Sequence, residues 1–395
     1  MSLALVVAVV LVVQRGDRHE VDPRPVEVAR ASPADAAAVL AALVSGVESA
    51  DAAALSDLAA AGAGEEALAG VAANVESLGL TDVSARYVDQ VGAVATDGSW
   101  SAVAQLGWRV AGDAVPSRAD VVVRFAPAAD DDGVGIAGFG GDGAGRVPLW
   151  LRGELSVARA PGVLVMVDGP QDEADAVADR VTRGVGVVRR VLPDWREPVV
   201  VEVPASAAEL DETLGATPGT YAAIAAVTAT AGSSSSADAP VHVFVNPDIT
   251  AGLRRAAAQV VMSHELVHVA TDAARGVGEP WLVEGFADYV ALRGTGLPDR
   301  TTLGRAIAAA RRDGVPEDLP GATDFDTRDS SLQARYEEAW LACRIIAERL
   351  GERGLLSVYD EVAAGTPVPT TLRDAGLPTR ELVRSWRARL ERLAS

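Results

Sequence analysis

The sequence predicts an α+β fold, because helical and strand-like spacings of apolar residues occupy separate stretches of the chain. Residues 32–78 have the spacing of helices, whereas much of 83–151 alternates polar and apolar side chains, which is typical of strands. Helices that precede a run of antiparallel strands indicate a small α+β domain. A chain of 395 residues is long enough for two domains. We therefore predict one domain over residues 32–153 and a larger domain of strands and helices over residues 160–395.

The first predicted domain begins with a helix signal at Ser32-Pro33, an N-cap residue followed by a proline suited to the first helical position. The helical pattern continues to residue 78 and is interrupted at residues 62–64. Strand-like segments follow at residues 83–88, 99–108, 119–125 and 147–151. This layout resembles the curved-sheet domains of the SnoaL-like and cystatin-like kind, which implies a cone-like α+β fold.

A glycine-rich stretch, Gly133-Val-Gly-Ile-Ala-Gly138, matches the spacing of a dinucleotide-binding loop. Such a loop must follow a strand and open a helix. Here the stretch follows three aspartates and leads into further glycines, so we expect a hairpin with a mobile loop instead.

The N-terminus carries a targeting signal. Residues 3–13 are all apolar, but as a helix these eleven residues would span only about 16 Å of a hydrocarbon core of about 30 Å. We therefore expect residues 1–14 to be a hydrophobic signal or membrane-anchor segment, and the proline-dotted residues 15–31 to be a linker. This implies an extracytoplasmic protein, secreted or membrane-anchored. A buried strand in a cytosolic protein is the alternative interpretation.

Composition excludes several classes of partner and site. The formal net charge of −20 argues against nucleic acid as a partner, because phosphate binding requires a basic surface. Cys343, the single cysteine, rules out an internal disulfide and a cysteine-based metal site. Its apolar neighbours indicate a small core residue. No pattern in the sequence indicates an oligomeric state.

The second predicted domain begins with strands and helices in alternation and ends in helices. We expect strands at residues 163–167, 198–203, 221–230 and 241–245, and helices at residues 171–191 and 206–214. Further helices should follow at residues 302–313, 332–350, 355–364 and 379–393. His242 lies in one of the predicted strands, where we expect it to be exposed.

The motif that indicates a function is His264-Glu-Leu-Val-His268. On a helix, residues four apart lie one above the other on the same face, so His264 and His268 can bind one metal ion. Glu265 stands at the edge of that face, where it could activate water. This H-E-x-x-H spacing is the zinc-protease signature, with the glutamate as general base. The alternative is a chance match on a buried helix, but uncompensated imidazoles among apolar residues would be costly.

A catalytic zinc ion takes three protein ligands and leaves one position for water. Glu284 follows His268 by sixteen residues, enough for the helix to end near Gly276 and Gly278 and for a second helix to return antiparallel. Asp288 lies four residues further on, hence on the same face. We expect Glu284 to bind the metal, and Asp288 to accept a hydrogen bond from an imidazole that binds the metal. The alternative is a solvated acidic face, which the apolar neighbours disfavour.

The motif H-E-L-V-H and the later W-L-V-E-G-F-A-D-Y, residues 281–289, together resemble the gluzincins, the thermolysin-like zinc metallopeptidases, and especially their aminopeptidase-like branch. The resemblance implies a zincin-like fold for residues 160–395, with a mixed-sheet upper lobe and a helical lower lobe. It also implies an edge strand that binds peptide backbone, at residues 241–246 or 221–227. The G-x-M-E-N stretch of that branch is absent, since residues 243–250 read V-F-V-N-P-D-I-T, so aminopeptidase activity does not follow.

The same resemblance assigns roles to individual residues. It implies Zn²⁺ bound by His264, His268 and Glu284, with Glu265 as the general base. Tyr336 opens a Y-E stretch that is similar to one in the aminopeptidase-like branch, where the tyrosine hydroxyl stabilises the developing oxyanion. The alternatives are that Tyr336 only packs at a helix start, or that Tyr289 fills this role.

These observations predict a zinc-dependent peptidase that hydrolyses a peptide or protein substrate. The alternative function is a catalytically silent binding protein, in which the zincin scaffold recognises peptide or cell-envelope ligands. Glu265 favours the enzyme, because a protein that only binds has no need of a general base.

Overall fold

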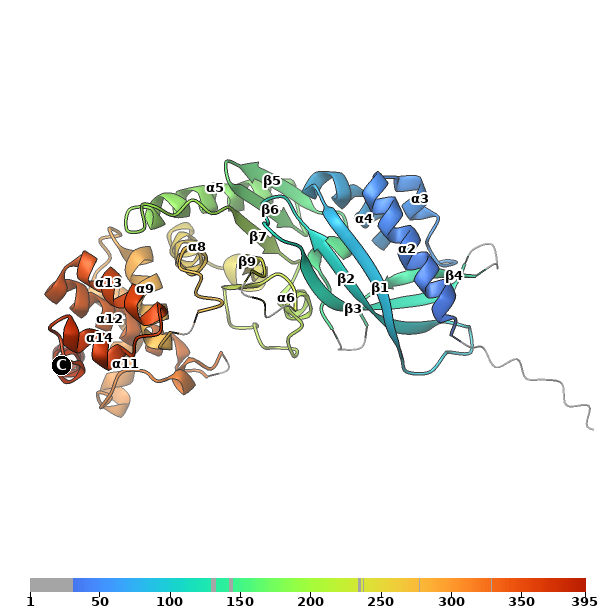
Figure 1. The fold of residues 1–395 in the computed structure, drawn as a ribbon. Coiled ribbons are helices and arrows are strands. Elements are labelled where there is room, and N and C mark those ends of the chain that lie inside the picture. The colour runs from blue at the N-terminus through green and yellow to red at the C-terminus, as the bar shows by residue number, and fades with distance from the viewer. Residues whose placement is uncertain are drawn as a thin grey trace, which may run out of the picture.

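The computed structural model describes residues 31–128, 133–141, 145–233, 236, 238–276, 278–327 and 329–395. It confirms the α+β class: a four-stranded antiparallel sheet, a mixed five-stranded sheet and a mainly helical C-terminal region follow one another along the chain (Figure 1). The expected signal or anchor segment and nearly all of the expected linker lie outside the described residues. No described helix combines the length and the apolar character that crossing a membrane requires.

The N-terminal unit packs three helices against the antiparallel sheet. The helices are α2 (Pro33–Ser49), α3 (Ala52–Ser56) and α4 (Glu65–Leu78), and the strands are β1 (Thr81–Val91), β2 (Trp100–Arg109), β3 (Ser117–Pro127) and β4 (Val134–Phe139). Ser32 caps α2 as predicted, because its side chain accepts a hydrogen bond from the Asp35 amide. Leu40 and Leu68 of the helices share one core with Phe125 of β3.

One strand prediction in this unit is wrong. Residues 147–151 are not a strand, because Pro148 precedes a short 3₁₀ helix, η1 (Leu149–Leu151), whose residues are all buried. The glycine-rich stretch forms β4 and pairs with β3 as a hairpin, so it opens no helix, and its loop lies largely outside the described residues. Gly135 permits a close backbone approach: a Cβ there would lie 2.6 Å from the Ala60 nitrogen.

The second sheet is mixed, with antiparallel strands at its two edges. Its strands, in sheet order, are β5 (Ser156–Ala160), β6 (Val163–Val167), β7 (Val199–Val203), β9 (Val241–Val245) and β8 (Ala226–Thr230). The inner strands β6, β7 and β9 are parallel, whereas β5 and β8 run antiparallel to their neighbours. The strand predicted at 221–230 begins only at Ala226, and β5 was not predicted. Because β9 lies between β7 and β8, residues 241–246 cannot be an edge strand, and β8 is the edge.

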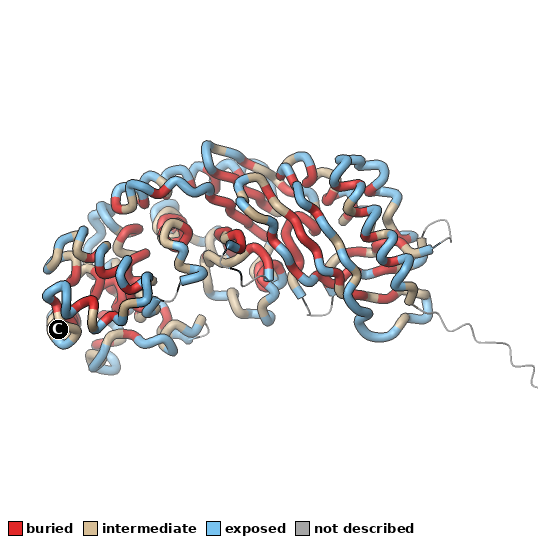
Figure 2. Tube along the Cα trace, in the orientation of Figure 1, coloured by how far each residue is buried: buried red, intermediate tan, exposed pale blue. Residues whose placement is uncertain are grey.

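Both faces of this second sheet are covered. The helices between its strands and after it are α5 (Gln171–Val188), α6 (Ala207–Leu214), α7 (Pro247–Thr250) and α8 (Arg255–Ala270). Val163 and Val165 of β6 pack on the face that carries α5 and α8, whereas Leu164 and Met166 belong to the core of the N-terminal unit. Figure 2 shows buried residues along the strands of both sheets. The two units therefore share a core through β6 and β7.

His242 corrects another expectation, because its side chain is only 1% exposed. Its Nδ1 lies 2.7 Å from a Glu202 carboxylate oxygen, and its Nε2 lies 3.0 Å from Asp113, which belongs to the turn between β2 and β3. Burial lowers the pKa of His242, but Asp113 and Glu202 outweigh burial and raise it to about 10. His242 is therefore a buried cation that joins the second sheet to the N-terminal unit. The strand pattern could not reveal this, because the covering residues lie far away in sequence.

The C-terminal region is a cluster of helices around α12. Its elements are α9 (Pro280–Leu292), α10 (Asp299–Thr302), α11 (Gly304–Asp313), η2 (Ala322–Phe325), α12 (Leu332–Leu350), α13 (Glu352–Ala363), α14 (Val368–Asp374) and α15 (Thr379–Ala394). Cys343 is fully buried among them, as predicted for a small core residue. Trp386 of α15 is also fully buried, and its indole nitrogen donates a hydrogen bond to the Glu338 carbonyl oxygen. At Gly285, an added Cβ would lie 2.4 Å from the Ala339 carbonyl oxygen, so α9 and α12 touch there.

Removing the buried cation should destabilise the protein in a pH-dependent way. The folded-state pKa of His242, about 10, exceeds the ordinary value of 6.5, so its stabilisation is complete below pH 6.5 and is lost as pH rises through 10. At pH 6 we expect His242→Gln to lower the free energy of unfolding by about 3–5 kcal/mol. Urea unfolding of both proteins at pH 6 and pH 10 should show a clearly smaller difference at pH 10. An equal difference at the two pH values would contradict the assignment.

Candidate metal centre

Helix α8 places two imidazoles together because of their spacing alone. His264 and His268 lie four residues apart, and their Nε2 atoms are 3.0 Å from each other. The rest of the helix holds this face in place, since Leu266 and Val267 are fully buried in the core beneath the second sheet. The imidazoles are largely shielded as well, with side-chain exposures of 13% and 10%.

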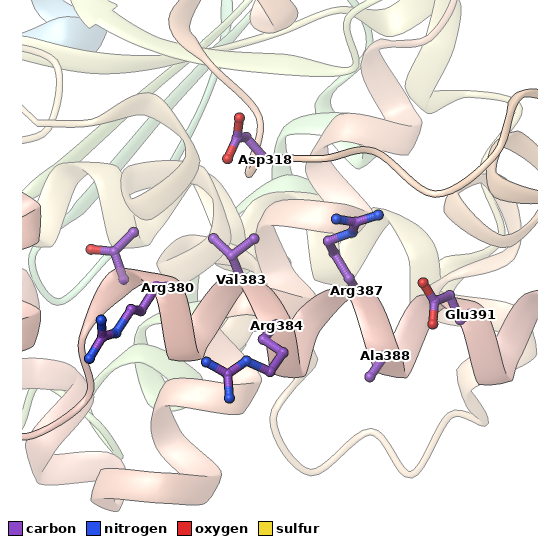
Figure 3. A pocket seen from close by; sticks show the side chains of 8 residues that line it. Asp318, Arg380, Val383, Arg384, Arg387, Ala388 and Glu391 are labelled. Atoms are coloured by element: carbon purple, nitrogen blue, oxygen red, sulfur yellow. The ribbon is translucent and has the colours of Figure 1, made fainter.

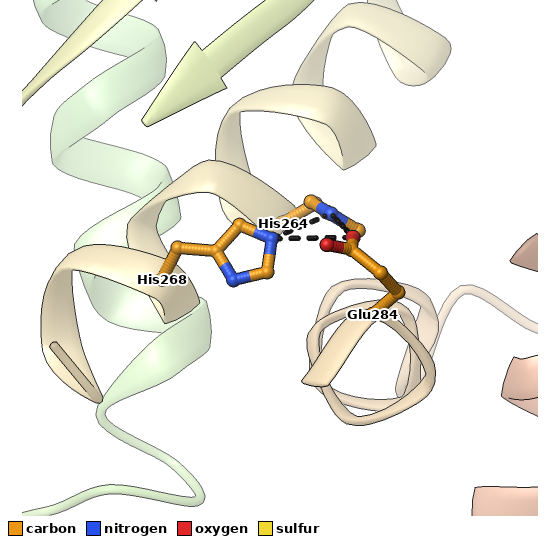
Figure 4. A group of neighbouring side chains, drawn as sticks. All are labelled: His264, His268 and Glu284. Atoms are coloured by element: carbon orange, nitrogen blue, oxygen red, sulfur yellow. Dashed lines mark hydrogen bonds and ion pairs between the residues drawn. The ribbon is translucent and has the colours of Figure 1, made fainter. Parts of the chain in front are cut away.

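Helix α9 brings Glu284 to the same point. The chain turns after α8 through Asp272, which has a left-handed φ of 54°, and α9 begins at Pro280. A Glu284 oxygen then lies 3.1 Å from His264 Nε2 and 3.4 Å from His268 Nε2 (Figure 4). The structure thus brings together the three residues that we predicted as metal ligands.

The geometry of these three groups fits a metal ion. Their ligand atoms, two imidazole nitrogens and a carboxylate oxygen, all lie within 4.8 Å of one another. Ligands bonded to zinc at about 2.0–2.1 Å in a tetrahedron are about 3.3 Å apart, close to the separations of 3.0, 3.1 and 3.4 Å seen here. Two histidines and one glutamate also match the donor types that zinc accepts while keeping one position open. The cluster could therefore hold a metal ion.

Charge compensation shapes the protonation of this cluster. Burial acts to raise the pKa of Glu284, but His268 and His264 outweigh it and hold that pKa well below its ordinary value. Burial lowers the pKa of His264, yet Asp288 and Glu284 raise it well above 6.5. His264 thus pairs with Glu284 and Asp288. A bound cation would take the place of the proton on His264 Nε2.

Asp288 lies where the sequence predicted it, one turn beyond Glu284. One of its carboxylate oxygens is 2.8 Å from His264 Nδ1, so His264 can donate its Nδ1–H and keep Nε2 free for a metal. His268 lacks such a contact, because its Nδ1 is buried and has no hydrogen-bond partner among the described residues.

Glu265 lies next to the cluster and is only 6% exposed. Its carboxylate oxygen Oε2 is 2.7 Å from the hydroxyl of Thr228 on β8. Thr228 is not among the residues that the sequence motifs predict. The strand around it could be predicted, but no pattern of residue types marks this threonine as a neighbour of Glu265.

The two candidate tyrosines point to different places. The Tyr336 ring meets the His264 ring edge-on, with 6.1 Å between the ring centroids. Burial and the nearby Glu284, Glu265 and Asp288 all raise the pKa of Tyr336, so its phenol stays protonated. The Tyr289 hydroxyl instead lies 3.2 Å from a carboxylate oxygen of Glu352 on α13.

A hollow of about 710 Å³ runs along α15 and is separate from this cluster (Figure 3). Arg380, Arg384 and Arg387 project from the helix, and Asp318 lies on the loop above it in this view. The lining of the hollow does not include His264, His268 or Glu284, so the hollow is not part of the candidate metal site.

Comparison with known protein families finds no family that matches this chain, and comparison with curated proteins finds no matching protein.

The geometry leads to a prediction about metal content. We expect one zinc ion per chain after loading and dialysis, no bound zinc in His264→Ala or His268→Ala, and weaker binding in Glu284→Ala. Elemental analysis of the purified proteins measures this directly. Glu279→Gln is a matched control. Glu279 directly precedes α9, the helix that carries Glu284, but it is exposed and is not one of the three predicted metal ligands. Full zinc occupancy in His268→Ala would refute the site.

Proposed function

We propose that this protein is a zinc-dependent peptidase of the gluzincin type. The proposal depends above all on one observation: two histidines and a glutamate meet at ligand distances, with a second glutamate directly beside them. Glu265, next to His264, is the residue that a binding protein would not need. The extracytoplasmic location, secreted or membrane-anchored, is part of the proposal and is based on residues 1–14.

The sheet supports this proposal through its edge. Strand β8 ends the sheet next to α8, and no described strand pairs with its outer side. An extended peptide could add to this edge by main-chain hydrogen bonds. The substrate strand would then lie beside the helix that carries His264, Glu265 and His268. Only Ala226 and Val227 of the range 221–227 belong to this strand.

The proposed reaction divides proton transfer and charge stabilisation between two residues. When bound, zinc would polarise the scissile carbonyl and the attacking water. Glu265 would take a proton from that water and pass it to the leaving nitrogen. The phenol of Tyr336, kept protonated by burial and the surrounding carboxylates, would donate a hydrogen bond to the oxygen that becomes negative. Asp288 would hold the His264 ring in the orientation that presents Nε2.

Replacement of the base tests the proposal against the alternative of a silent binding protein. Glu265→Gln should keep its zinc and its fold but lose about 10²–10⁴-fold in the rate of peptide hydrolysis, because proton transfer is removed. Digestion of a peptide library by the zinc-loaded protein measures the rate, and Glu279→Gln serves as the control. A wild-type rate in Glu265→Gln would exclude this mechanism and favour the binding function.

The two tyrosines provide a second test. Tyr336→Phe should lower kcat and kcat/KM together by about 10²–10³-fold, the usual effect of losing one oxyanion donor, with zinc content unchanged. Tyr289→Phe is the matched control, because the Tyr289 hydroxyl interacts with Glu352 and Arg293 rather than with the His264, His268 and Glu284 cluster, so kcat should stay unchanged. Loss of activity in Tyr289→Phe, with Tyr336→Phe fully active, would reverse the assignment.

A further inference from the structure

Thr228 lies on β8 and faces α8, the helix that carries His264, Glu265 and His268. Along this strand, Val227 and Ala229 pack toward α6 together with Phe244, so the alternate residues point to the opposite face. That face carries α8, and Ala226 of β8 belongs to the same core as Leu266. The period of two therefore directs the Thr228 side chain toward α8.

The Thr228 hydroxyl contacts Glu265 at two points. Its Oγ1 lies 2.7 Å from the carboxylate oxygen Oε2 and 3.1 Å from the main-chain carbonyl oxygen of the same residue. A threonine hydroxyl has a single proton, so it donates to one of these acceptors at a time. The shorter contact, to the charged oxygen, is the stronger one.

No other described residue donates a hydrogen bond to the Glu265 carboxylate. Glu265 is also only 6% exposed, so few water molecules can replace a lost donor. A glutamate side chain has three rotatable bonds, and its rotamers are separated by small energies unless a neighbour selects one. The hydrogen bond from Thr228 to Oε2 selects one rotamer, and it leaves Oε1 able to accept a proton.

We propose that Thr228 is a positioning residue for the general base, holding the Glu265 carboxylate in the orientation that proton transfer requires. This inference rests on the proposed peptidase function. The contact with the Glu265 carbonyl oxygen suggests a purely structural role as a competing explanation, in which Thr228 only joins β8 to α8. Only the positioning role requires that the Glu265 carboxylate lose its fixed orientation when the Thr228 hydroxyl is removed.

Kinetics of the zinc-loaded protein on a peptide library separate these roles. Thr228→Val keeps the shape of the side chain but removes the donor, and should lower kcat by about 10- to 100-fold with little change in KM, as expected for a lost hydrogen bond to a charged group. Thr228→Ser, which restores the hydroxyl, should recover most of the rate. Thr230→Val is the matched control, because Thr230 lies on the same face of β8 but its hydroxyl donates to the Gly232 carbonyl oxygen.

A double variant shows whether Thr228 acts through Glu265. In a Glu265→Gln background, Thr228→Val should cause almost no further loss, because residues that act as a unit are not additive. A structural role would instead lower the melting temperature and cause the same additional loss in both backgrounds. An active Thr228→Val protein, alongside an inactive Glu265→Gln protein, would overturn the inference and leave the peptidase function intact.

Crystal structures of the zinc-loaded variants give a measurement that does not depend on activity. The Glu265 side chain should keep one rotamer in Thr228→Ser and adopt several in Thr228→Val. A single, unchanged rotamer in Thr228→Val would overturn the positioning role. If the wild-type protein hydrolyses no peptide, the peptidase function fails, and the rotamer comparison still decides whether Thr228 orients Glu265.

Discussion

The position of Glu284 between two imidazoles is the constraint on which the arrangement of the helical region depends. A carboxylate shielded from water is unstable unless opposite charge or hydrogen-bond donors compensate it. His264 and His268 provide this compensation only while α8 and α9 keep their spacing. Gly285 secures α9 from the other side, because only glycine lets the helix lie so close to the Ala339 carbonyl oxygen of α12. The geometry of the candidate metal site therefore depends on the packing of three helices, α8, α9 and α12.

The second sheet provides the support for this arrangement. One face of this sheet carries α8, and the other face is covered by the N-terminal unit and by α6. Strand β6 therefore contributes alternate residues to two cores. The buried cluster of His242, Asp113 and Glu202 joins the two units at β9, the strand next to β8. The N-terminal unit thus covers β6 and β7 on the face opposite α8, and α6 covers β8 on that face. The contribution of the N-terminal unit to the site is indirect, through the position of the edge strand.

Three polar side chains around the His264, His268 and Glu284 cluster come from separate elements. Glu265 comes from the metal helix itself, Thr228 from the edge strand and Tyr336 from α12. Burial strengthens the hydrogen bonds of these side chains, because little water is present to compete for their donors and acceptors. Burial and the nearby carboxylates also raise the pKa of Tyr336, so its phenol stays protonated.

The sequence by itself determined those features that depend on chain neighbours. The cap at Ser32, the helix of residues 332–350 and the pairing of His264 with His268 follow from local spacing, because helical geometry relates residues a few positions apart. Local rules failed at residues 147–151, which were predicted as a strand but end in a buried 3₁₀ helix, η1. Only the tertiary structure decided that His242 is buried against Asp113, 129 residues away, and that Thr228 reaches Glu265, 37 residues away. No periodicity along the chain relates such residues; they meet because the sheet, its helices and the N-terminal unit pack into shared cores.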